Sequence, residues 1–497
     1  MDQDILLENR LQSAPNYESW LSIAKELDRV RELDQWRKQP VTSLFDHKLI
    51  TSRIKSLRAA RNANDLPTMK LLIRSGLLRN LGGIMDVRLF TVSYVGTKNL
   101  IEEYLAEVTT TIQYIADLDA EMESLQSRLE LFTEVEQSFG HTALLLHGGT
   151  TFGLYHVGVV EALYRARLLP KVISGSSIGA LIAALICIHD ENELPGLFVT
   201  GGINLEAFAT KKGGSIRRKI TRLLTNGYLL DIQVLEECVK ANLGDITFEE
   251  AYAKTGMILN ITVSSSRKNE IPRVLNHLTS PNVLIRSAAC ASSSMKFLYN
   301  SVDLLAKNSS GQIFVWSPSS IKWGNSYSDN DSPEQRLAEL FNVNHFILSQ
   351  AQPYIAPFLS KSPKSNSAMT NIVHKALTFT SSEIRFRMTQ LARLGLIPQS
   401  LGSLFDLKIH GHVTIAPPLD SMDFYTIFGN PTYESLDYWI LKGQRSTWPF
   451  LAMIKNRTLI EMKLYEVKYA ISCALERRRT TIADPRSILK KRTQSIG

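Results

Sequence analysis

The sequence predicts an α/β protein whose mostly parallel sheet is flanked by helices, with further helical segments before and after it. Two observations carry this prediction. Leu144–His189 reads as two strand-turn-helix units in tandem, each with a glycine-rich turn where the strand ends. A third short apolar run, Met257–Val263, follows in the same part of the chain. Short apolar strands that alternate with helices of this length are typical of parallel α/β sheets.

The first part of the chain, residues 1–140, is predicted to be an N-terminal helical accessory module. Apolar residues recur at helical spacing in four stretches. The helices expected there are Tyr17–Val30, Leu44–Asn62, Leu66–Ser75 and a longer one over Leu100–Phe132. Because this part carries no chemical motif, we expect it to pack on the catalytic domain.

Residues 141–350 are predicted to form the catalytic domain. Leu144–Leu146 is apolar and stops at Gly148-Gly149, which indicates a buried parallel strand rather than a helix. Helical spacing returns after each glycine turn. In chain order we expect strand Leu144–Leu146, helix Phe152–Arg167, strand Val172–Ile173, helix Ile178–Ile188, strand Met257–Val263, helix Asn282–Ala291, a polar loop over Leu304–Pro333, helix Glu334–Phe341 and strand His345–Gln350.

The last part divides into a helical C-terminal region, residues 351–476, and a flexible basic tail, residues 477–497. We expect the helical region to pack on the catalytic domain or on lipid. A linker is predicted at Ser360–Asn371, and helices at Ile372–Leu396 and Leu459–Leu475. The second of these helices has an apolar stripe, which suits either a lipid interface or a protein core.

The positive charge is concentrated at the C-terminal end. From Leu451 onward the chain carries eleven Lys and Arg against four Asp and Glu, and so nearly all of the net charge of +8. Such tails bind nucleic acid or anionic lipid headgroups, or only keep a protein soluble. No basic module interleaved with aromatic residues accompanies this tail, so no nucleic-acid partner is expected.

The composition excludes several classes of protein. With 44% hydrophobic and 21% charged residues, the chain is too apolar for wholesale disorder. Its four cysteines are scattered without C-x-x-C spacing, so we expect no zinc site and no disulfide framework. No apolar run reaches the roughly 18 residues of a transmembrane helix, and the first residues show no signal-peptide pattern.

The second glycine turn has the spacing of a nucleophile elbow. It reads Gly175-Ser176-Ser177-Ile178-Gly179, which fits G-x-S-x-G. In such a turn the serine stands between a strand and a helix, so its hydroxyl is exposed and the helix N-terminus favours developing negative charge. Small residues on both sides let the backbone make the turn. Ser177 is therefore the candidate nucleophile.

The first glycine turn supplies a candidate oxyanion hole. It runs from His147 to Gly153 and opens a helix, and its backbone N–H groups can approach an oxyanion without intervening side chains. The candidate donors are Gly148, Gly149 and Thr150. A nucleotide phosphate loop is the alternative, but the turn has neither G-x-G-x-x-G nor a following Gly-Lys-Ser/Thr, so we favour the oxyanion hole.

These two turns resemble a known family. LLLHGGTTFGLYHVGVVEAL followed by VISGSSIGALIAAL is similar to the patatin-like phospholipase and lipase family, in which a glycine loop precedes G-x-S-x-G. The blocks TFEEAYAKTG, NHLTSPNVLIRSA, RLAELFNVNHFILSQ and KGQRSTWPFLAMIKNR resemble the fungal patatin-like triacylglycerol lipases of lipid droplets, and the resemblance spans Tyr17–Glu466. It implies a patatin-like fold and a Ser-Asp dyad without a catalytic histidine. It implies no metal and no organic cofactor.

The position of the dyad aspartate departs from the family pattern. The resemblance puts it shortly after a tryptophan, here Trp323, and shortly before a block that here contains Pro333. Counting from both sides arrives at Asn325. An amide cannot take the proton of the serine, so the usual general base is missing. A third glycine of the family's loop is also replaced, by Thr150, which keeps its backbone N–H.

Three interpretations stay open. Asp329 or Asp331 supplies the base from a reshaped loop, or a histidine such as His156 takes that role. Alternatively, the protein has lost most of its activity and keeps the fold and the lipid-binding surface. Oxyanion stabilisation and binding leave some catalysis when one member of a triad is lost, so weak and absent activity both stay open.

The function that the resemblance implies is that of a serine-dependent triacylglycerol lipase in lipid-droplet triacylglycerol breakdown. If a lysophospholipid resolves the acyl-enzyme, the same site becomes an acyltransferase. The alternative is a catalytically weak or inactive lipid-droplet protein that binds lipid or supports an active lipase. We expect the protein on the lipid droplet, with the endoplasmic reticulum membrane or cytosol as second choice, and contact with lipid through the basic C-terminal region.

Overall fold

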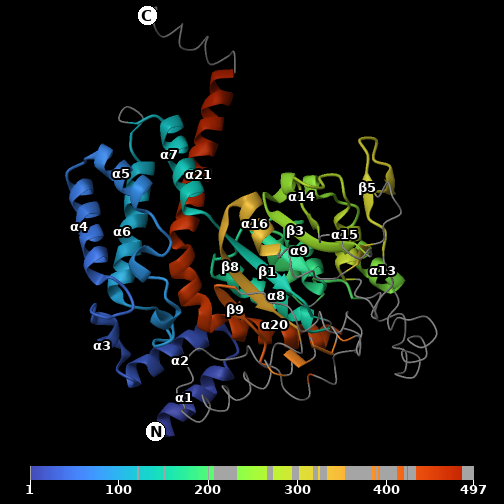
Figure 1. Cartoon of the computed structure of the whole chain (residues 1–497), viewed down its shortest axis with the longest axis horizontal. Helices are drawn as coiled ribbons and strands as arrows, with labels where there is room; N and C mark the ends of the chain where they lie inside the picture. Colours follow the sequence, from blue (N-terminus) through green and yellow to red (C-terminus); the bar gives the residue numbers. More distant parts are fainter. Residues whose placement is uncertain are drawn as a thin grey trace, which may run out of the picture. The chain divides into compact units, whose positions relative to one another are not determined.

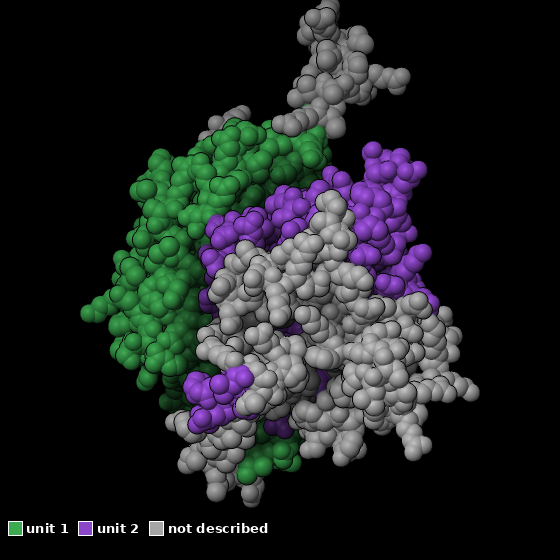
Figure 2. All heavy atoms as spheres, turned by 45° about the vertical axis from the view of Figure 1, so that its right-hand side comes forward, with its two compact units in different colours: residues 1–11, 21–141, 452–497 green, residues 12–20, 142–451 purple. Residues whose placement is uncertain are grey.

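The computed structural model describes residues 2–119, 123–149, 151–199, 201–205, 232–265, 273–293, 302–316, 323–324, 333–352, 411–418 and 432–483, with a few single positions between 383 and 423. Contacts divide the chain into two compact units (Figure 2). Unit 1 comprises residues 1–11, 21–141 and 452–497, and unit 2 comprises residues 12–20 and 142–451. This division groups the last part of the chain with the N-terminal helices.

Unit 2 is built on a seven-stranded sheet with the strand order β4-β3-β2-β1-β8-β9, and β7 pairs with β3 (Figure 1). β1 with β2, β2 with β3 and β8 with β9 are parallel, whereas β4 and β7 run antiparallel to β3. The strands are β1 (His141–His147), β2 (Val172–Ser176), β3 (Ile258–Ser265), β4 (Arg273–Leu275), β7 (Trp323–Gly324), β8 (Val343–Gln350) and β9 (Val413–Ile415).

Helices flank this sheet, which confirms the predicted fold class. α9 and α15 contact β2 and β3, α16 contacts β8, and α8 packs against α20. The described helices of unit 2 are α8 (Tyr155–Arg165), α9 (Ile178–Cys187), α10 (Leu194–Leu197), α13 (Ile232–Leu243), α14 (Phe248–Thr255), α15 (Ile285–Ser293), α16 (Pro333–Phe341) and α20 (Tyr433–Thr447).

The register of the central strands brings the two glycine turns to one edge of the sheet. His147 at the end of β1 pairs with Ser176 at the end of β2. β1 and β2 are almost wholly buried, as expected for strands covered on both faces. Because the carboxyl ends of parallel strands meet at the same edge, the turns after β1 and β2 emerge side by side.

Two glycines let α8 and α20 approach each other closely. A Cβ atom on Gly158 would lie 1.9 Å from the backbone oxygen of Ile440. A Cβ atom on Gly443 would lie 2.3 Å from the backbone oxygen of Tyr155. Larger residues at either position would force the helices apart, so this crossing holds the start of α8 behind the first glycine turn.

The prediction of an unbroken loop over Leu304–Pro333 is wrong. The structure has an antiparallel hairpin there, formed by β5 (Leu305–Lys307) and β6 (Ile313–Val315). The side chain of Asn308 accepts hydrogen bonds from two backbone N–H groups of the turn, at 3.1 and 2.8 Å. Gly311 supplies the positive φ of 81°. The polar composition of this stretch predicted a loop. The two strands were missed because each is only three residues long.

Unit 1 is helical in its described part (Figure 1). Its helices agree closely with three of the four predicted stretches. They are, wholly or mostly within the unit, α1 (Asp2–Gln12), α2 (Tyr17–Val30), α3 (Leu33–Lys38), α4 (His47–Asn62), α5 (Leu66–Gly76), α6 (Asn99–Ala116), α7 (Leu125–Phe139) and α21 (Leu451–Ala483), with the 3₁₀ turns η1 (Leu81–Gly83) and η2 (Val87–Phe90).

The single helix predicted over Leu100–Phe132 is instead two helices, α6 and α7. Arg128 of α7 donates hydrogen bonds to the carbonyl oxygens of Ala116 and Leu118, both at 2.7 Å, and so satisfies groups at the end of α6. Ser124 caps the start of α7 through its hydroxyl. The apolar periodicity runs through both helices, and it therefore did not reveal the break.

The apolar stripe predicted for Leu459–Leu475 lies in the core of unit 1. Its members are at most 4% exposed: Ile460, Leu464, Val467 and Ile471. The sequence left two environments open for this stripe, a lipid interface or a protein core, and in the structure it lies in the core. No helix in the described part of the chain is long and apolar enough to span a membrane. The predicted linker Ser360–Asn371 and most of the predicted helix Ile372–Leu396 lie outside the described residues.

Candidate active site

Ser177 stands on a sharp turn between β2 and α9. Its backbone has φ 59° and ψ −132°, a conformation that residues other than glycine rarely adopt. Holding a residue there costs roughly 1–3 kcal/mol, which the surrounding structure must offset. Ser177 is half-buried, whereas Ser176 is buried. Within the described residues the hydroxyl of Ser177 makes no hydrogen bond, so it is the more available of the two serines.

The glycines on both sides of Ser177 are required by close backbone contacts. A Cβ atom on Gly179 would lie 2.1 Å from the backbone oxygen of Leu146. A Cβ atom on Gly175 would lie 2.5 Å from the Cα of Ala180. Any larger residue would have to displace the backbone of β1 or of α9, which explains the spacing of the motif in physical terms.

The glycine turn after β1 adopts an equally unusual backbone. Gly148 and Gly149 have φ values of 77° and 93°. A Cβ atom on Gly148 would lie 2.2 Å from Cγ of Gln352, so the side chain of Gln352 fills the space beside the loop. Thr150, the third predicted donor, lies outside the described residues. The 3₁₀ turn η3 (Thr151–Leu154) then leads into α8.

The structure brings this loop and the elbow together. A Cβ atom on Gly153 would lie 2.2 Å from Cγ2 of Ile178, the residue after Ser177. The backbone N–H of Gly148 donates a hydrogen bond of 3.3 Å to the carbonyl oxygen of Ser176. The two turns therefore form one site at the carboxyl edge of the sheet.

Two backbone N–H groups at this junction have no hydrogen-bond partner among the described residues. They belong to Gly149 and Ile178, whereas the N–H of Gly148 is already engaged. Ile178 is the first residue of α9, where an N–H has no partner within the helix. One N–H from a loop and one from the residue after the nucleophile form the oxyanion hole in many hydrolases. Sequence reasoning missed Ile178, although its place after the elbow serine is the signal for it.

Comparison with known proteins fits this geometry. Residues 2–137 match a family described as a domain of unknown function (DUF3336), and residues 144–329 match the patatin-like phospholipase family. Triacylglycerol lipase ptl1 of Schizosaccharomyces pombe is 34% identical over 454 residues, which span 90% of this chain and 82% of that protein. The chain belongs to the patatin-like phospholipase family.

Other similar proteins are also named triacylglycerol lipases. Triacylglycerol lipase ptl3 of Schizosaccharomyces pombe is 33% identical over 464 residues, or 91% of this chain and 95% of that protein. Triacylglycerol lipase SDP1L of Arabidopsis thaliana is 35% identical over 469 residues, or 92% of this chain but only 58% of that protein. These comparisons confirm the resemblance to the patatin-like family that the sequence motifs indicated.

The segment in which the general base is expected lies outside the described residues. Asn325, at the expected position of the aspartate, and the candidate substitutes Asp329 and Asp331 all fall there. The chain reaches this segment from β7, which pairs with β3 through Ser264 opposite Gly324. Sequence reasoning did not predict this short strand.

The pairing of β7 shows at which edge of the sheet the described chain stops. On β3, Ile261 is level with Gly175 of β2. Ser264, the partner of Gly324, lies three residues further along β3. The last described residue before Asn325 therefore lies at the carboxyl end of β3, beyond the level of Gly175, at the edge of the sheet that carries the elbow.

Two buried histidines lie behind the glycine loop. Nδ1 of His156 is 2.7 Å from the hydroxyl oxygen of Ser349 on β8, and Nδ1 of His147 is 3.3 Å from that of Ser176. Burial, together with a smaller effect of the nearby His156, lowers the pKa of His147 to about 3. Burial lowers the pKa of His156 to about 4, against the effect of the loop backbone beside it. His156 is paired with Ser349 and not with Ser177, so the structure does not place it as the base.

Two further serines contact the elbow and were not predicted. Ser292 and Ser293, at the end of α15, lie next to the backbone of Ser177. Both are buried, with 0% and 2% of their surface exposed. Their sequence, within a run of small residues, is typical of any tightly packed helix, so it carries no signal for this contact.

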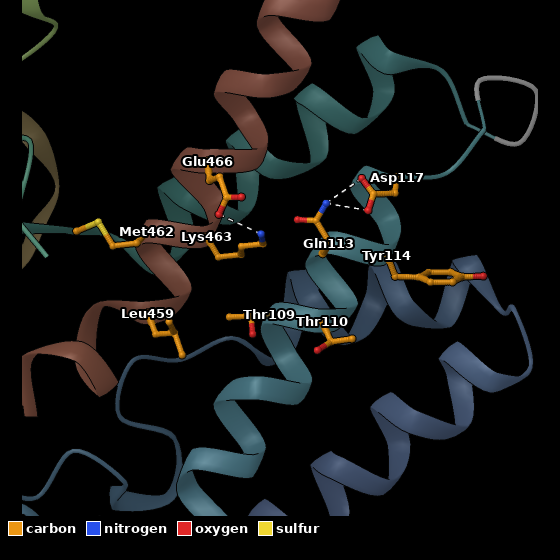
Figure 3. A pocket seen from close by; sticks show the side chains of 9 residues that line it. All are labelled: Thr109, Thr110, Gln113, Tyr114, Asp117, Leu459, Met462, Lys463 and Glu466. Atoms are coloured by element: carbon orange, nitrogen blue, oxygen red, sulfur yellow. Dashed lines mark hydrogen bonds and ion pairs between the residues drawn. The ribbon is translucent and has the colours of Figure 1, made fainter. Parts of the chain in front are cut away.

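A groove of about 540 Å³ lies within unit 1, between α6 and α21 (Figure 3). It is lined by Thr109, Thr110, Gln113, Tyr114, Asp117, Leu459, Met462, Lys463 and Glu466. Polar side chains pair along their own helices, Gln113 with Asp117 at 2.8 Å and Lys463 with Glu466 at 3.0 Å. The groove contains no residue predicted for catalysis, and the described residues hold no cluster of His, Cys, Asp or Glu suited to a metal ion.

Proposed function

We propose that this patatin-like protein is a serine-dependent acyl hydrolase of neutral glycerolipids, with triacylglycerol as its first substrate. The observation that carries the proposal is the strained backbone of Ser177 beside two N–H groups, those of Gly149 and Ile178, that have no hydrogen-bond partner in the described part of the chain. The relatives named triacylglycerol lipases support the choice of substrate.

In the proposed reaction, Oγ of Ser177 attacks the carbonyl carbon of an ester, and its proton passes to a general base. The N–H groups of Gly149 and Ile178 stabilise the negative charge that develops on the carbonyl oxygen. The leaving diacylglycerol takes the proton as the C–O bond breaks, and the acyl group stays on Ser177. Water then resolves the acyl-enzyme and releases a fatty acid. A lysophospholipid in place of water would make the product a phospholipid.

The general base is proposed to be Asp329 or Asp331. Asn325 has no basic oxygen, because an amide remains neutral at physiological pH. His156 is committed to Ser349 at 2.7 Å. A carboxylate from the segment that follows β7 is therefore the remaining candidate among the bases considered.

Labelling with a fluorophosphonate tests the nucleophile directly. Purified full-length protein should react, and mass spectrometry should locate the adduct on Ser177. The Ser177→Ala variant is the control and should show no adduct on that peptide. Wild-type protein that stays unlabelled, while a known serine hydrolase in the same tube is labelled, would overturn the proposal in favour of an inactive lipid-binding protein.

Triolein hydrolysis tests the substrate and the base. We expect wild-type protein to release fatty acid from emulsified triolein. Asp329→Asn and Asp331→Asn, made singly, should differ, because only one carboxylate is proposed to act, and losing a general base typically lowers the rate about 10²–10⁴-fold. Full activity in the double variant would exclude both residues. Addition of lysophospholipid to the same assay measures acyl transfer.

We further propose that the protein works at the surface of lipid droplets. Triacylglycerol is insoluble, so its hydrolase must bind an interface. Arg477 and Arg478, near the end of α21, are exposed and begin the basic C-terminal region. The apolar stripe of α21 is buried, so the proposed contact relies on these basic residues and on those after Ala483.

A further inference from the structure

The backbone of Ser177 is held from α15 by two side-chain hydroxyl groups. The N–H of Ser177 donates to Oγ of Ser292 at 3.1 Å. The carbonyl oxygen of Ser177 accepts from Oγ of Ser293 at 3.1 Å, and from the N–H of Ala180 at 2.9 Å. One residue of the elbow thus has both its backbone polar groups engaged, and two of the three partners are serine side chains of another helix.

The hydroxyl of Ser292 links the elbow to β3. It donates its proton to the carbonyl oxygen of Thr262 at 2.8 Å, which leaves its lone pairs for the N–H of Ser177. Ser292 is fully buried, so water cannot replace it without entering the core. The orientation of this hydroxyl is fixed by its two partners.

The hydroxyl of Ser293 is a weaker restraint. It lies within hydrogen-bonding distance of two acceptors, the carbonyl oxygens of Ser177 at 3.1 Å and of Ala289 at 2.9 Å. A hydroxyl has only one proton to donate, so the two acceptors share it. Loss of Ser293 should therefore matter less than loss of Ser292.

These contacts orient the two peptide groups on either side of the Ser177 Cα atom. The N–H of Ser177 belongs to the peptide group before this atom, and its carbonyl to the one after it. Fixing both planes fixes φ and ψ, the two rotations that set the direction of the side chain. This is the restraint that a residue at φ 59° needs, because isolated serine would leave that conformation.

The same contacts direct the candidate oxyanion donor. The carbonyl of Ser177 and the N–H of Ile178 are parts of one trans peptide group, so they point in opposite directions. Holding the carbonyl toward Ser293 and Ala180 directs the N–H of Ile178 away from them. The N–H of Ser177 itself is used by Ser292 and does not serve as an oxyanion donor.

We propose that Ser292, assisted by Ser293, is a positioning residue that holds Ser177 and the Ile178 N–H in their reactive arrangement. The inference rests on the proposed role of Ser177 as nucleophile. Ser292 and Ser293 do not touch the substrate in this proposal. They act by keeping the elbow in a conformation that it would otherwise leave.

The test compares Ser292→Ala with Ser287→Ala in the full-length protein. Ser287 is a matched control, because it is also on α15 and 3% exposed. Its hydroxyl donates to the carbonyl oxygen of Leu284 and accepts from the N–H of Leu305, so it has no bond to the elbow. Fluorophosphonate labelling is followed over time to separate the inhibition constant from the maximal rate of inactivation.

We expect Ser292→Ala to lower the maximal rate of inactivation by about tenfold or more, since small misplacements of reacting groups carry penalties of this size. Its inhibition constant should stay within about twofold of wild type. Ser293→Ala should lower the rate by a smaller factor, and Ser287→Ala should leave it unchanged. Equal rates for Ser292→Ala and Ser287→Ala would overturn the proposal while leaving Ser177 as the nucleophile.

Hydrogen–deuterium exchange gives a measurement that needs neither activity nor a variant. In wild-type protein the amide of Ser177 should exchange as slowly as the amides of β2, because it donates to Ser292. Rapid exchange at Ser177 with protected β2 amides would contradict the inference. If wild-type protein is not labelled at all, the proposed function fails, and the exchange result still decides whether Ser292 holds the elbow.

Discussion

At the scale of single residues, the site depends on positions where no residue larger than glycine fits. Gly179 lies so close to Leu146 that a Cβ atom would come within 2.1 Å of a backbone oxygen. Ser177 is the exception, a residue with a side chain at φ 59°. Strain of this kind is tolerated where chemistry needs the exposed side chain and the surroundings restrain it.

The buried histidines lead to a pH-dependent prediction. The pKa values of His147 and His156 are lowered from 6.5 to about 3 and about 4, so between pH 6.5 and pH 4 the unfolded chain binds protons that the folded chain does not. The free energy of unfolding must then fall as the pH falls. Each of the two histidines contributes roughly 1.4 kcal/mol for each pH unit.

We expect His156→Gln to make the urea midpoint less sensitive to pH between 6.5 and 5 than it is in wild type. Glutamine keeps a polar group near Ser349 but cannot be protonated in this range. The measurement is a series of urea titrations at fixed pH values. A pH dependence that is identical in the two proteins would show that His156 does not resist protonation in the folded state.

At the scale of elements, α21 is joined to the rest of unit 1 by buried charges as well as by its apolar stripe. Arg79 contacts Glu461 at 3.1 Å, with 10% and 1% of their side chains exposed. Arg79 also donates to the carbonyl oxygens of Gly140 and Arg457, both at 2.9 Å. Tyr465 donates to Glu461 at 3.2 Å, and burial raises the pKa of this tyrosine.

Removing the carboxylate of Glu461 should destabilise unit 1 strongly. Glu461→Gln deprives the buried guanidinium of Arg79 of its counter-charge, and breaking such a pair costs about 3–5 kcal/mol. Glu466→Gln on the same helix is the control, because Glu466 is 68% exposed and forms a surface pair with Lys463. Hydrogen exchange of the α5–α7 peptides reports on the unit, and equal exchange in the two variants would contradict the expectation.

At the scale of the whole molecule, the two ends of the chain contribute to one unit. Residues 21–141 and 452–497 group together, although the 310 residues from 142 to 451 separate them. A truncation that removes α21 would therefore also remove part of the core around which the N-terminal helices pack. A test of the basic tail has to leave α21 intact.

We predict that deleting residues 484–497 weakens binding to lipid while the fold is kept. This segment contains Arg486, Lys490, Lys491 and Arg492. Each basic residue near an anionic membrane contributes roughly 1 kcal/mol, and added salt screens this attraction. Flotation with vesicles of phosphatidylcholine and phosphatidylserine, and with triolein droplets, measures the change. A variant with a neutral Gly/Ser segment of equal length is the control, and deletion without loss of binding would refute a role for the tail.

The sequence alone was sufficient for the parts of the protein that depend on local patterns. The strand-turn-helix units, the elbow at Ser177 and the glycine loop were predicted from spacing, because glycine and apolar residues act within a few positions of the chain. Three of the four helical stretches predicted in the N-terminal part agree with the structure for the same reason. The break between α6 and α7 was missed because the apolar periodicity continues through it, and the short strands β5–β7 because so few residues carry no period.

The tertiary structure decided what depends on contacts between distant residues. Only the fold brings Ser292 of α15 to the N–H of Ser177, a separation of 115 residues, and only the fold assigns the stripe of α21 to the core of unit 1. The structure also engages the N–H of Gly148 with the carbonyl oxygen of Ser176, so that among the described residues Gly149 and Ile178 are the candidate oxyanion donors. Hydrogen-bond partners and burial are properties of the assembled chain, and for that reason the sequence determined which residue is the candidate nucleophile, while the tertiary structure determined what holds that residue in place.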